Sequence, residues 1–188
     1  MTVAEEKAAC RTRALARRDA LTAPERRAKS LAICRALESL ELLHHAKTVL
    51  GYAAFGSECE LSPFYDTLRA KGVRLAFPLA GSGGRMEAYI PCGALRPGRF
   101  GVPEPEVQNA VLVAPEELDA VLVPCVAFDF ELGRLGHGKG YYDRYLSRCP
   151  QAAAILTAFE VQRLPSIPRE AHDLSFSILA TEDGIYYK

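Results

Sequence analysis

The 188-residue sequence contains no tryptophan, only two methionines and no net charge, because 23 Lys and Arg balance 23 Asp and Glu. It also lacks the run of about 20 apolar residues that a membrane-spanning helix needs, and the roughly 7–15 that a signal peptide needs. The charge balance excludes a basic nucleic-acid coat or an acidic solvating tail as a property of the whole chain. Because the long apolar runs are missing, we expect no membrane partner.

The six cysteines lack the spacing of a metal site. No two form a C-x-x-C pair, and no histidine lies at zinc-ligand spacing from them. They are isolated, several of them in apolar stretches such as 122–128, which favours reduced, buried thiols and a cytoplasmic location. Because the number of cysteines is even, disulfides remain possible and are the less favoured alternative.

Strand-like and helical runs alternate along most of the chain, which is typical of a three-layer α/β domain. At this length we expect a single domain spanning 1–188, large enough to bury about 70 % of its unfolded surface without staples. We expect helices at 4–20, 24–43, 62–71 and 141–147, and strands at 48–55, 73–77, 120–128, 152–159, 177–180 and 185–187. The continuous apolar runs predict buried parallel strands. The fold class is therefore α/β, with a mostly parallel sheet flanked by helices and preceded by two N-terminal helices.

Shorter patterns mark where some of these elements begin and end. The second helix begins with Thr22-Ala-Pro-Glu25, the pattern of a capping box with a proline in the first turn. A turn at Asp183-Gly184 joins the two closing strands. The turn-rich segments Gly81–Gly84 and Pro91–Pro105 are expected to be surface loops.

The most informative segment is 133–144, Gly-Arg-Leu-Gly-His-Gly-Lys-Gly-Tyr-Tyr-Asp-Arg. It lies between a predicted strand and a predicted helix, an arrangement in which backbone N–H groups converge on an anion. Arg134, Lys139 and Arg144 add positive charge, so a phosphate group is the expected ligand. Gly140 stands where a P-loop has the Ser or Thr that binds Mg²⁺, and the spacing does not match a dinucleotide fingerprint. A solvated glycine turn remains the alternative.

Two acids and two bases elsewhere could complete such a site. Asp143 could bind Mg²⁺ in place of the missing hydroxyl, or it could stabilise the first turn of its helix. Asp173, in the pair His172-Asp173, is by itself more typical of a turn. Lys7 and Arg11 lie one helical turn apart, so they can face one ligand, although the residues alone favour a solvated helix face.

The neutral total hides a basic N-terminal end. Residues 7–35 contain nine Lys and Arg but only two acids. A nucleic-acid-binding arm is therefore an alternative function, but this segment has no aromatic side chain on which bases could stack.

Segments 123–129 and 133–144 together resemble the signature of the 5-formyltetrahydrofolate cyclo-ligase family, also called methenyltetrahydrofolate synthetases. Three weaker elements agree in the same order along the chain: Lys-x-x-x-Arg at 7–11, Glu-Pro within 101–105, and His-Asp followed by Thr-Glu within 172–182. The resemblance implies an enzyme that uses ATP and Mg²⁺ to convert 5-formyltetrahydrofolate to 5,10-methenyltetrahydrofolate, releasing ADP and phosphate.

The resemblance also implies roles for individual residues. In the family, the formyl oxygen is phosphorylated, nitrogen 10 of the folate attacks the activated carbon, and phosphate leaves. Lys139 and Arg134 would be catalytic, Asp143 and Asp173 would hold Mg²⁺, and Glu58 and Tyr142 would contact the folate. The residues that would bind the nucleotide are Lys7, Arg11, Arg134, Gly136, His137, Gly138, Lys139, Gly140, Tyr141 and Tyr142.

The resemblance implies a reduced folate and ATP as small-molecule partners. We expect a monomer that binds no nucleic acid. A non-catalytic relative that binds folate or nucleotide is the alternative, and the presence of Lys139, Asp143 and Asp173 argues against it.

Overall fold

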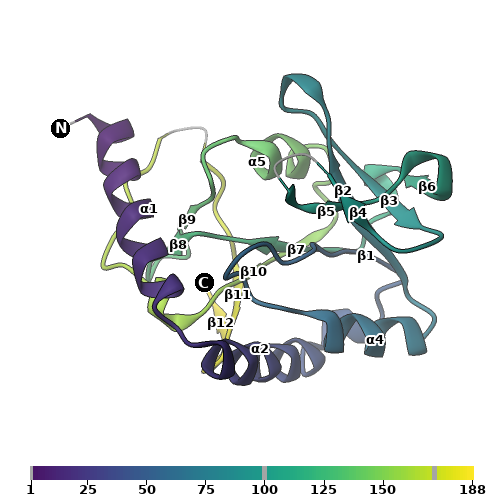
Figure 1. Ribbon diagram of the computed structural model, residues 1–188, viewed down its shortest axis with the longest axis horizontal. Helices are drawn as coiled ribbons and strands as arrows, with labels where there is room; N and C mark the ends of the chain where they lie inside the picture. Colours follow the sequence, from purple (N-terminus) through teal and green to yellow (C-terminus); the bar gives the residue numbers. More distant parts are fainter. Residues whose placement is uncertain (1, 99–100, 171–172) are drawn as a thin grey trace.

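The computed structural model describes residues 2–98, 101–170 and 173–188. Its centre is an eight-stranded mixed sheet in the order β12-β11-β10-β7-β1-β2-β3-β6 (Figure 1). Five consecutive strands are parallel: β11 (Ile178–Thr181), β10 (Ala153–Thr157), β7 (Ala120–Pro124), β1 (Thr48–Leu50) and β2 (Arg74–Ala80). The antiparallel strands lie outside these, β12 (Gly184–Tyr187) at one edge and β3 (Met86–Pro91) and β6 (Ala110–Val113) at the other. The predicted mostly parallel α/β fold is confirmed.

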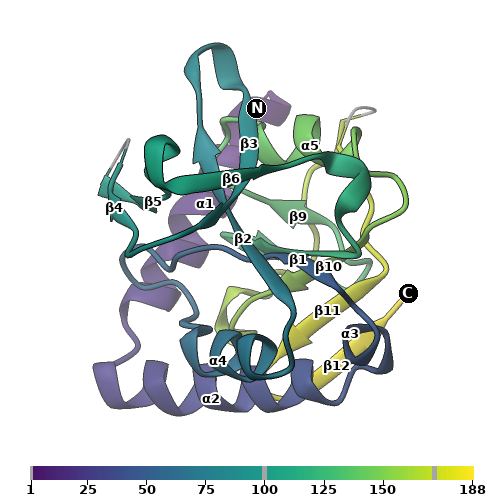
Figure 2. The same ribbon diagram turned by 90° about the vertical axis from the view of Figure 1, so that its right-hand side faces the viewer.

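Helices cover both faces of the sheet. Helices α2 (Ala23–Glu38), α3 (Glu41–His44) and α4 (Ser62–Ala70) lie on one side, and α5 (Tyr141–Leu146) lies on the other (Figures 1 and 2). Successive strand residues alternate between the two cores: Leu122 packs on the α2 and α4 side, whereas Val121 and Val123 pack with α5. Because both faces are buried, the strands carry the continuous apolar runs seen in the sequence.

Helix α1 (Val3–Asp19) lies across the end of the sheet where β7 leads into β8 (Ala127–Phe128), as Figure 1 shows. It packs against β8 and the short helix η5 (Glu160–Gln162) through a third cluster that includes Cys10, Ala14 and Leu164. A capping box begins both α1 and α2, and the one at Thr22 was predicted. These contacts bring the N-terminal helix beside residues more than a hundred positions away.

Three predicted boundaries were wrong, and each has a local cause. The helix predicted at 24–43 ends at Glu38, because Leu40 adopts extended backbone and enters the core before α3 begins. The strand predicted at 48–55 ends at Leu50, because the Tyr65 hydroxyl accepts from the Tyr52 N–H and donates to the Tyr52 carbonyl. Strand β2 continues through Pro78, since it pairs with β3 alone beyond Ala76, and the missing N–H costs no bond to β1.

Other elements differ in detail from the expectation. The apolar run 120–128 divides into β7 and β8. The predicted loop 81–84 is the turn of the β2–β3 hairpin and contains the short helix η1 (Ser82–Gly84). The predicted loop 91–105 contains a small hairpin of β4 (Arg96–Pro97) and β5 (Pro103–Glu104). Strands β3 and β6 were not predicted at all.

All six cysteines are free thiols. Five are buried as predicted, but Cys92, in the loop after β3, is exposed. In the described part of the chain, no helix is both long enough and apolar enough to cross a membrane.

Candidate functional site

A cavity of about 980 Å³ is lined by every one of the thirteen predicted site residues. They come from α1, the loop after β1, the strand β9 (Arg134–Leu135), the glycine loop 136–140, α5 and the loop before β11. The thirteen are Lys7, Arg11, Glu58, Arg134, Gly136, His137, Gly138, Lys139, Gly140, Tyr141, Tyr142, Asp143 and Asp173. The fold thus brings residues up to 166 positions apart to one place.

The glycine loop connects β9 to α5. Gly138 and Gly140 have φ values of +84° and +65°, a conformation that side-chain-bearing residues rarely adopt. Among the described residues, nothing accepts a hydrogen bond from the backbone N–H of Gly138, Gly140 or Tyr141. These three N–H groups therefore remain available to an anion in the cavity.

The surroundings of this loop differ in one respect from the predicted strand, turn and helix. A small antiparallel hairpin of β8 and β9 stands between β7 and the loop. Gly133 lies in the turn of that hairpin, where its N–H donates to the Asp129 carboxylate at 2.8 Å. Gly133 therefore shapes the approach to the loop and is not one of its anion-facing residues.

Helix α1 holds the glycine loop from one side. Arg11 Nε donates to the Gly136 carbonyl at 2.8 Å. Lys7 Nζ lies 2.6 Å from Asp173 Oδ2 and 2.7 Å from Glu170 Oε2. Lys7 is buried, so the alternative of a solvated helix face is wrong for this residue. Burial lowers the pKa of Lys7, but the bonds and charges of Asp173 and Glu170 outweigh it and raise the pKa, so the side chain stays cationic.

Arg134 forms a fixed positive charge in the cavity wall. Only 8 % of its side chain is exposed, and its Nε donates to the Pro124 carbonyl at 3.2 Å. One terminal nitrogen lies 3.5 Å from Asp143 Oδ1, and the guanidinium lies 5.4 Å from the centre of the Tyr142 ring. Burial, with the nearby charge of Glu58, raises the pKa of Tyr142, so this phenol remains neutral and able to donate.

Glu58 connects the loop after β1 to the glycine loop. Its Oε1 lies 3.5 Å from His137 Nε2, and its Oε2 accepts from the Phe55 N–H at 3.1 Å. His137 is more than half exposed, whereas the Glu58 side chain is nearly buried. The two residues thus meet across the cavity from separate segments.

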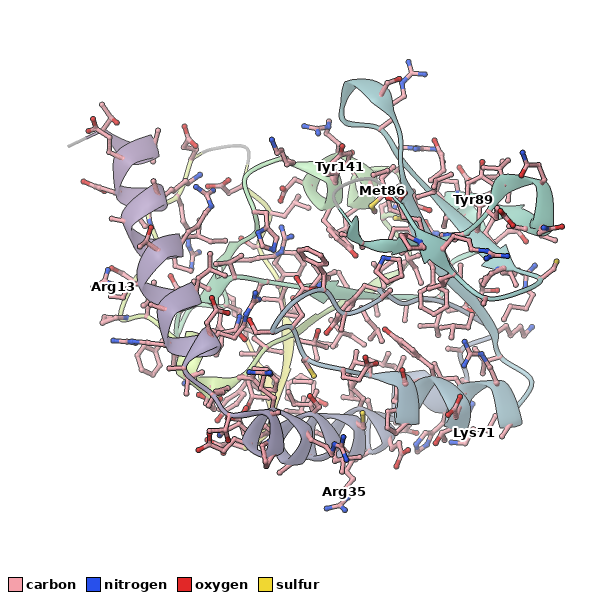
Figure 3. All side chains as sticks on the ribbon, viewed as in Figure 1. Arg13, Arg35, Lys71, Met86, Tyr89 and Tyr141 are labelled. Atoms are coloured by element: carbon pink, nitrogen blue, oxygen red, sulfur yellow. The ribbon has the colours of Figure 1, made fainter. Side chains whose placement is uncertain are left out.

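Several lining residues escaped the sequence reasoning. Most are apolar or aromatic: Tyr52, Phe55, Pro78, Met86, Val102 and Cys125. Such residues carry no signal in the sequence, because the core uses the same types. Met86 and Tyr141 are labelled in Figure 3, on β3 and α5. Two further acids, Glu104 and Glu170, also line the cavity, which therefore combines a charged part with an apolar one.

The acidic residues suit a cation that arrives with phosphate oxygens. Within the described ranges, no three or more His, Cys, Asp and Glu side chains are grouped to hold a metal by themselves. Asp143 is one-third exposed, and Asp173 Oδ2 also accepts from the Glu170 N–H at 2.7 Å. Mg²⁺ typically takes one or two carboxylates and completes its shell with phosphate oxygens and water, which this donor set allows. His172 lies outside the described residues.

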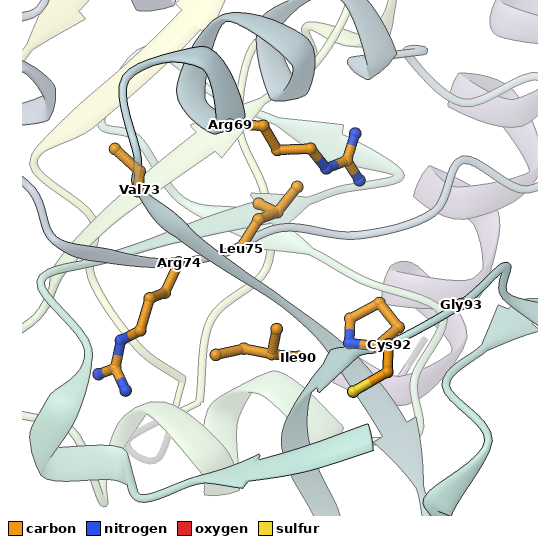
Figure 4. A pocket seen from close by; sticks show the side chains of 8 residues that line it. Arg69, Val73, Arg74, Leu75, Ile90, Cys92 and Gly93 are labelled. Carbon is orange, nitrogen blue, oxygen red and sulfur yellow. The ribbon is translucent and has the colours of Figure 1, made fainter. Parts of the chain in front are cut away.

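A second hollow, of about 430 Å³, lies near the antiparallel edge of the sheet (Figure 4). Its lining includes Arg69 and Arg74, but Arg69 pairs with Asp66, and Arg74 bonds to Thr48 and Glu117. None of the predicted site residues lines it.

Comparison with known proteins identifies the family. The sequence profile of the 5-formyltetrahydrofolate cyclo-ligase family matches residues 3–182. The chain belongs to this family. The 5-formyltetrahydrofolate cyclo-ligase of Mycolicibacterium smegmatis is 32 % identical over 147 residues, which cover 74 % of this chain and 76 % of that protein. A probable 5-formyltetrahydrofolate cyclo-ligase of Schizosaccharomyces pombe is 28 % identical over 174 residues, covering 84 % and 85 %.

The chain is also similar to solved structures of methenyltetrahydrofolate synthetases. Aquifex aeolicus 5,10-methenyltetrahydrofolate synthetase matches with a TM-score of 0.84 and 33 % identity, over 96 % of this chain and 92 % of that one. A 5,10-methenyltetrahydrofolate synthetase from Mycoplasma pneumoniae shares the fold, with a TM-score of 0.79 and 24 % identity over 94 % and 99 %. The chain is therefore an enzyme of the cyclo-ligase family, as its motifs predicted.

Proposed function

We propose that this chain converts 5-formyltetrahydrofolate to 5,10-methenyltetrahydrofolate, using ATP and Mg²⁺ and releasing ADP and phosphate. The observation that carries the proposal is the convergence of all thirteen predicted residues on one cavity. That cavity draws residues from Ala4 to Asp173, so we propose that residues 1–188 act as one catalytic domain.

The first step is the transfer of the γ-phosphoryl group to the formyl oxygen. A bond forms between that oxygen and phosphorus while the bond from phosphorus to the ADP oxygen breaks. Such transfers depend on positioning and on neutralising charge around the moving group. Lys139 and Arg134 would supply positive charge there, and the N–H groups of Gly138 and Gly140 would bind phosphate oxygens.

Helix α1 would hold the nucleotide from the other side of the loop. An ammonium group has three donors, and Glu170 and Asp173 use two of those of Lys7. Arg11 bonds to the loop through Nε alone, which leaves its terminal nitrogens near Gly138 for phosphate. Asp143 and Asp173 would hold Mg²⁺, which when bound supplies further neutralisation of phosphate charge.

Ring closure follows on the folate. Nitrogen 10 attacks the activated formyl carbon, a carbon–nitrogen bond forms, the proton on nitrogen 10 passes to solvent, and the carbon–oxygen bond breaks as phosphate leaves. Glu58 and the neutral phenol of Tyr142 would contact the folate, as an acceptor and a donor respectively. No Ser-His-Asp or Cys-His nucleophile is needed, because phosphate is the leaving group.

The position of the basic N-terminal residues also favours small-molecule ligands. Lys7, Arg11, Arg18 and Lys29 all bond to other parts of the protein. Arg13 and Arg35 project away from it in Figure 3, but they lie on different helices. The absence of nucleic-acid binding, the monomeric state and the cytoplasmic location stay predictions.

The test is to incubate the purified protein with 5-formyltetrahydrofolate, ATP and Mg²⁺ and to follow the absorbance of the methenyl product. We expect product that disappears when either ATP or the metal is omitted. Binding of both ligands without product would favour the non-catalytic relative. Salt-dependent RNA binding without ATP turnover would favour the nucleic-acid arm.

A further inference from the structure

Arg144, on α5, joins two parts of the cavity wall that are far apart in the chain. Its Nε and one terminal nitrogen donate to the Gly84 carbonyl at 3.1 and 3.0 Å. The same terminal nitrogen donates to the Lys139 carbonyl at 2.6 Å. Gly84 lies in the turn of the β2–β3 hairpin, and Lys139 lies in the glycine loop. The guanidinium therefore connects that turn to the glycine loop.

Two glycines make room for this guanidinium. Gly84 and Gly140 have φ values of +74° and +65°. A Cβ on Gly84 would collide with the terminal nitrogen of Arg144, and a Cβ on Gly140 would lie 2.7 Å from its other terminal nitrogen. Both positions thus favour glycine for its backbone angle, and a Cβ at either one would displace the Arg144 guanidinium.

We propose that Arg144 is a positioning residue that fixes the main chain of Lys139. Its charge alone would suggest a phosphate ligand, but its role is to hold the loop. The inference rests on the proposed function, in which Lys139 is the catalytic cation. Among the described residues, neutral carbonyl groups and no anions accept hydrogen bonds from the guanidinium. By holding the Lys139 carbonyl, Arg144 sets the direction in which the Lys139 side chain leaves the loop.

The same bonds make the hairpin part of the site. The strands that flank the turn carry Pro78, Ala80 and Met86, which line the cavity. Arg144 therefore couples the position of this wall to the position of the glycine loop. A planar fork with several donors suits two carbonyls at once, which a lysine ammonium on a flexible chain does not reproduce.

A matched pair of glycine substitutions tests the proposal. Gly83→Ala and Gly84→Ala impose the same kind of backbone cost, because φ is +65° and +74°. Only the Gly84 substitution meets Arg144, since a Cβ on Gly83 has nothing within 4 Å. We expect Gly84→Ala to lower kcat/KM for ATP at least tenfold, and Gly83→Ala to change it by less than twofold.

Substitutions of Arg144 complete the test. Arg144→Lys keeps the charge but loses the fork, so it should behave like Gly84→Ala. The double variant Gly84→Ala/Arg144→Ala should be no worse than Arg144→Ala alone, because both changes remove the same contact. If Arg144 instead acts through its charge on phosphate, Arg144→Lys keeps most of the activity. That result, or a Gly84→Ala variant as active as Gly83→Ala, would overturn the proposal.

Limited trypsin digestion of the nucleotide-free protein separates this inference from the proposed function. Arg144→Ala and Gly84→Ala should speed cleavage after Lys139 in the glycine loop, because the loop loses the bond that holds the Lys139 carbonyl, whereas Gly83→Ala should leave that cleavage rate unchanged. An unchanged rate of cleavage after Lys139 in Arg144→Ala would contradict the coupling. A wild-type protein that makes no methenyl product would refute the proposed function but not these digestion results.

Discussion

Replacing Asp129 by asparagine should loosen the scaffold beneath the cavity. Asp129 is buried, and its Oδ1 accepts from the N–H groups of Glu131 and Gly133 at 3.0 and 2.8 Å. Its Oδ2 accepts from the Ile167 N–H at 3.0 Å, and Arg169 lies 3.0 and 3.2 Å from the two oxygens. One carboxylate thus ties the β8–β9 turn, which precedes the glycine loop, to the segment that leads to Glu170 and Asp173.

The structure sets the size of the effect. An asparagine has one oxygen and one NH₂ group, so at least one of the three backbone N–H groups would face another donor. Leaving such a buried donor without a partner costs about 1–3 kcal/mol. Loss of the ion pair with Arg169, whose side chain is 36 % exposed, adds about 1 kcal/mol at most. We expect Asp129→Asn to lower the free energy of unfolding by about 1–4 kcal/mol and Tm by roughly 2–16 °C.

Urea unfolding, monitored by circular dichroism, measures this change. We expect the m value of the variant to equal that of the wild type. Asp66→Asn is the control, because Asp66 also pairs with an arginine but is exposed. It should change the free energy of unfolding by less than about 0.5 kcal/mol. If Asp129→Asn is as stable as Asp66→Asn, the buried network around Asp129 does not stabilise the fold as described.

Three further changes follow from the site. Lys139→Ala should abolish methenyl formation but keep Tm within about 2 °C of the wild type, because a loop side chain carries little core packing. A Lys139→Ala variant that turns over at the wild-type rate would remove Lys139 from the mechanism. Lys7→Met should lower the free energy of unfolding by about 1–2 kcal/mol relative to the wild type, since Glu170 and Asp173 lose their cation. Because the pKa of Lys7 is raised above 10.5, the difference should persist to about pH 10 and shrink only above it, and its loss by pH 9 would contradict the ion pair. Burial raises the pKa of Cys125 to about 12 and that of Cys149 to about 11, so Ellman's reagent at pH 8 should find one fast thiol, Cys92, and six after denaturation; several fast thiols would contradict this.

Local patterns made most of the fold predictable. The capping box at Thr22 and the apolar runs that form β7 and β10 depend on short stretches of sequence. The errors arose where a distant group decides the outcome. The end of β1 depends on the hydroxyl of Tyr65, and β6 forms only because β3 is there to pair with it. Such contacts leave no periodicity in their own segment.

The site shows the same division. The glycine loop and its charged residues indicated a phosphate site, because phosphate chemistry needs those residue types, and the family resemblance supplied the thirteen predicted residues. The sequence does not show with which group a charged side chain forms its hydrogen bonds or ion pairs. Arg144 was predicted only to add positive charge near the phosphate, whereas its guanidinium donates to the Gly84 and Lys139 carbonyls. Glu182, in the C-terminal element, pairs with Lys29 of α2 at 2.6 Å and lies outside the cavity lining.

The stoichiometry of the reaction tests the central claim most directly. The account predicts that one ADP and one phosphate form for each methenyl product, and that ADP formation stops when 5-formyltetrahydrofolate is withheld. Methenyl product formed without ADP, or ADP formed at the same rate without the folate, would contradict the phosphorylation of the formyl oxygen in this cavity.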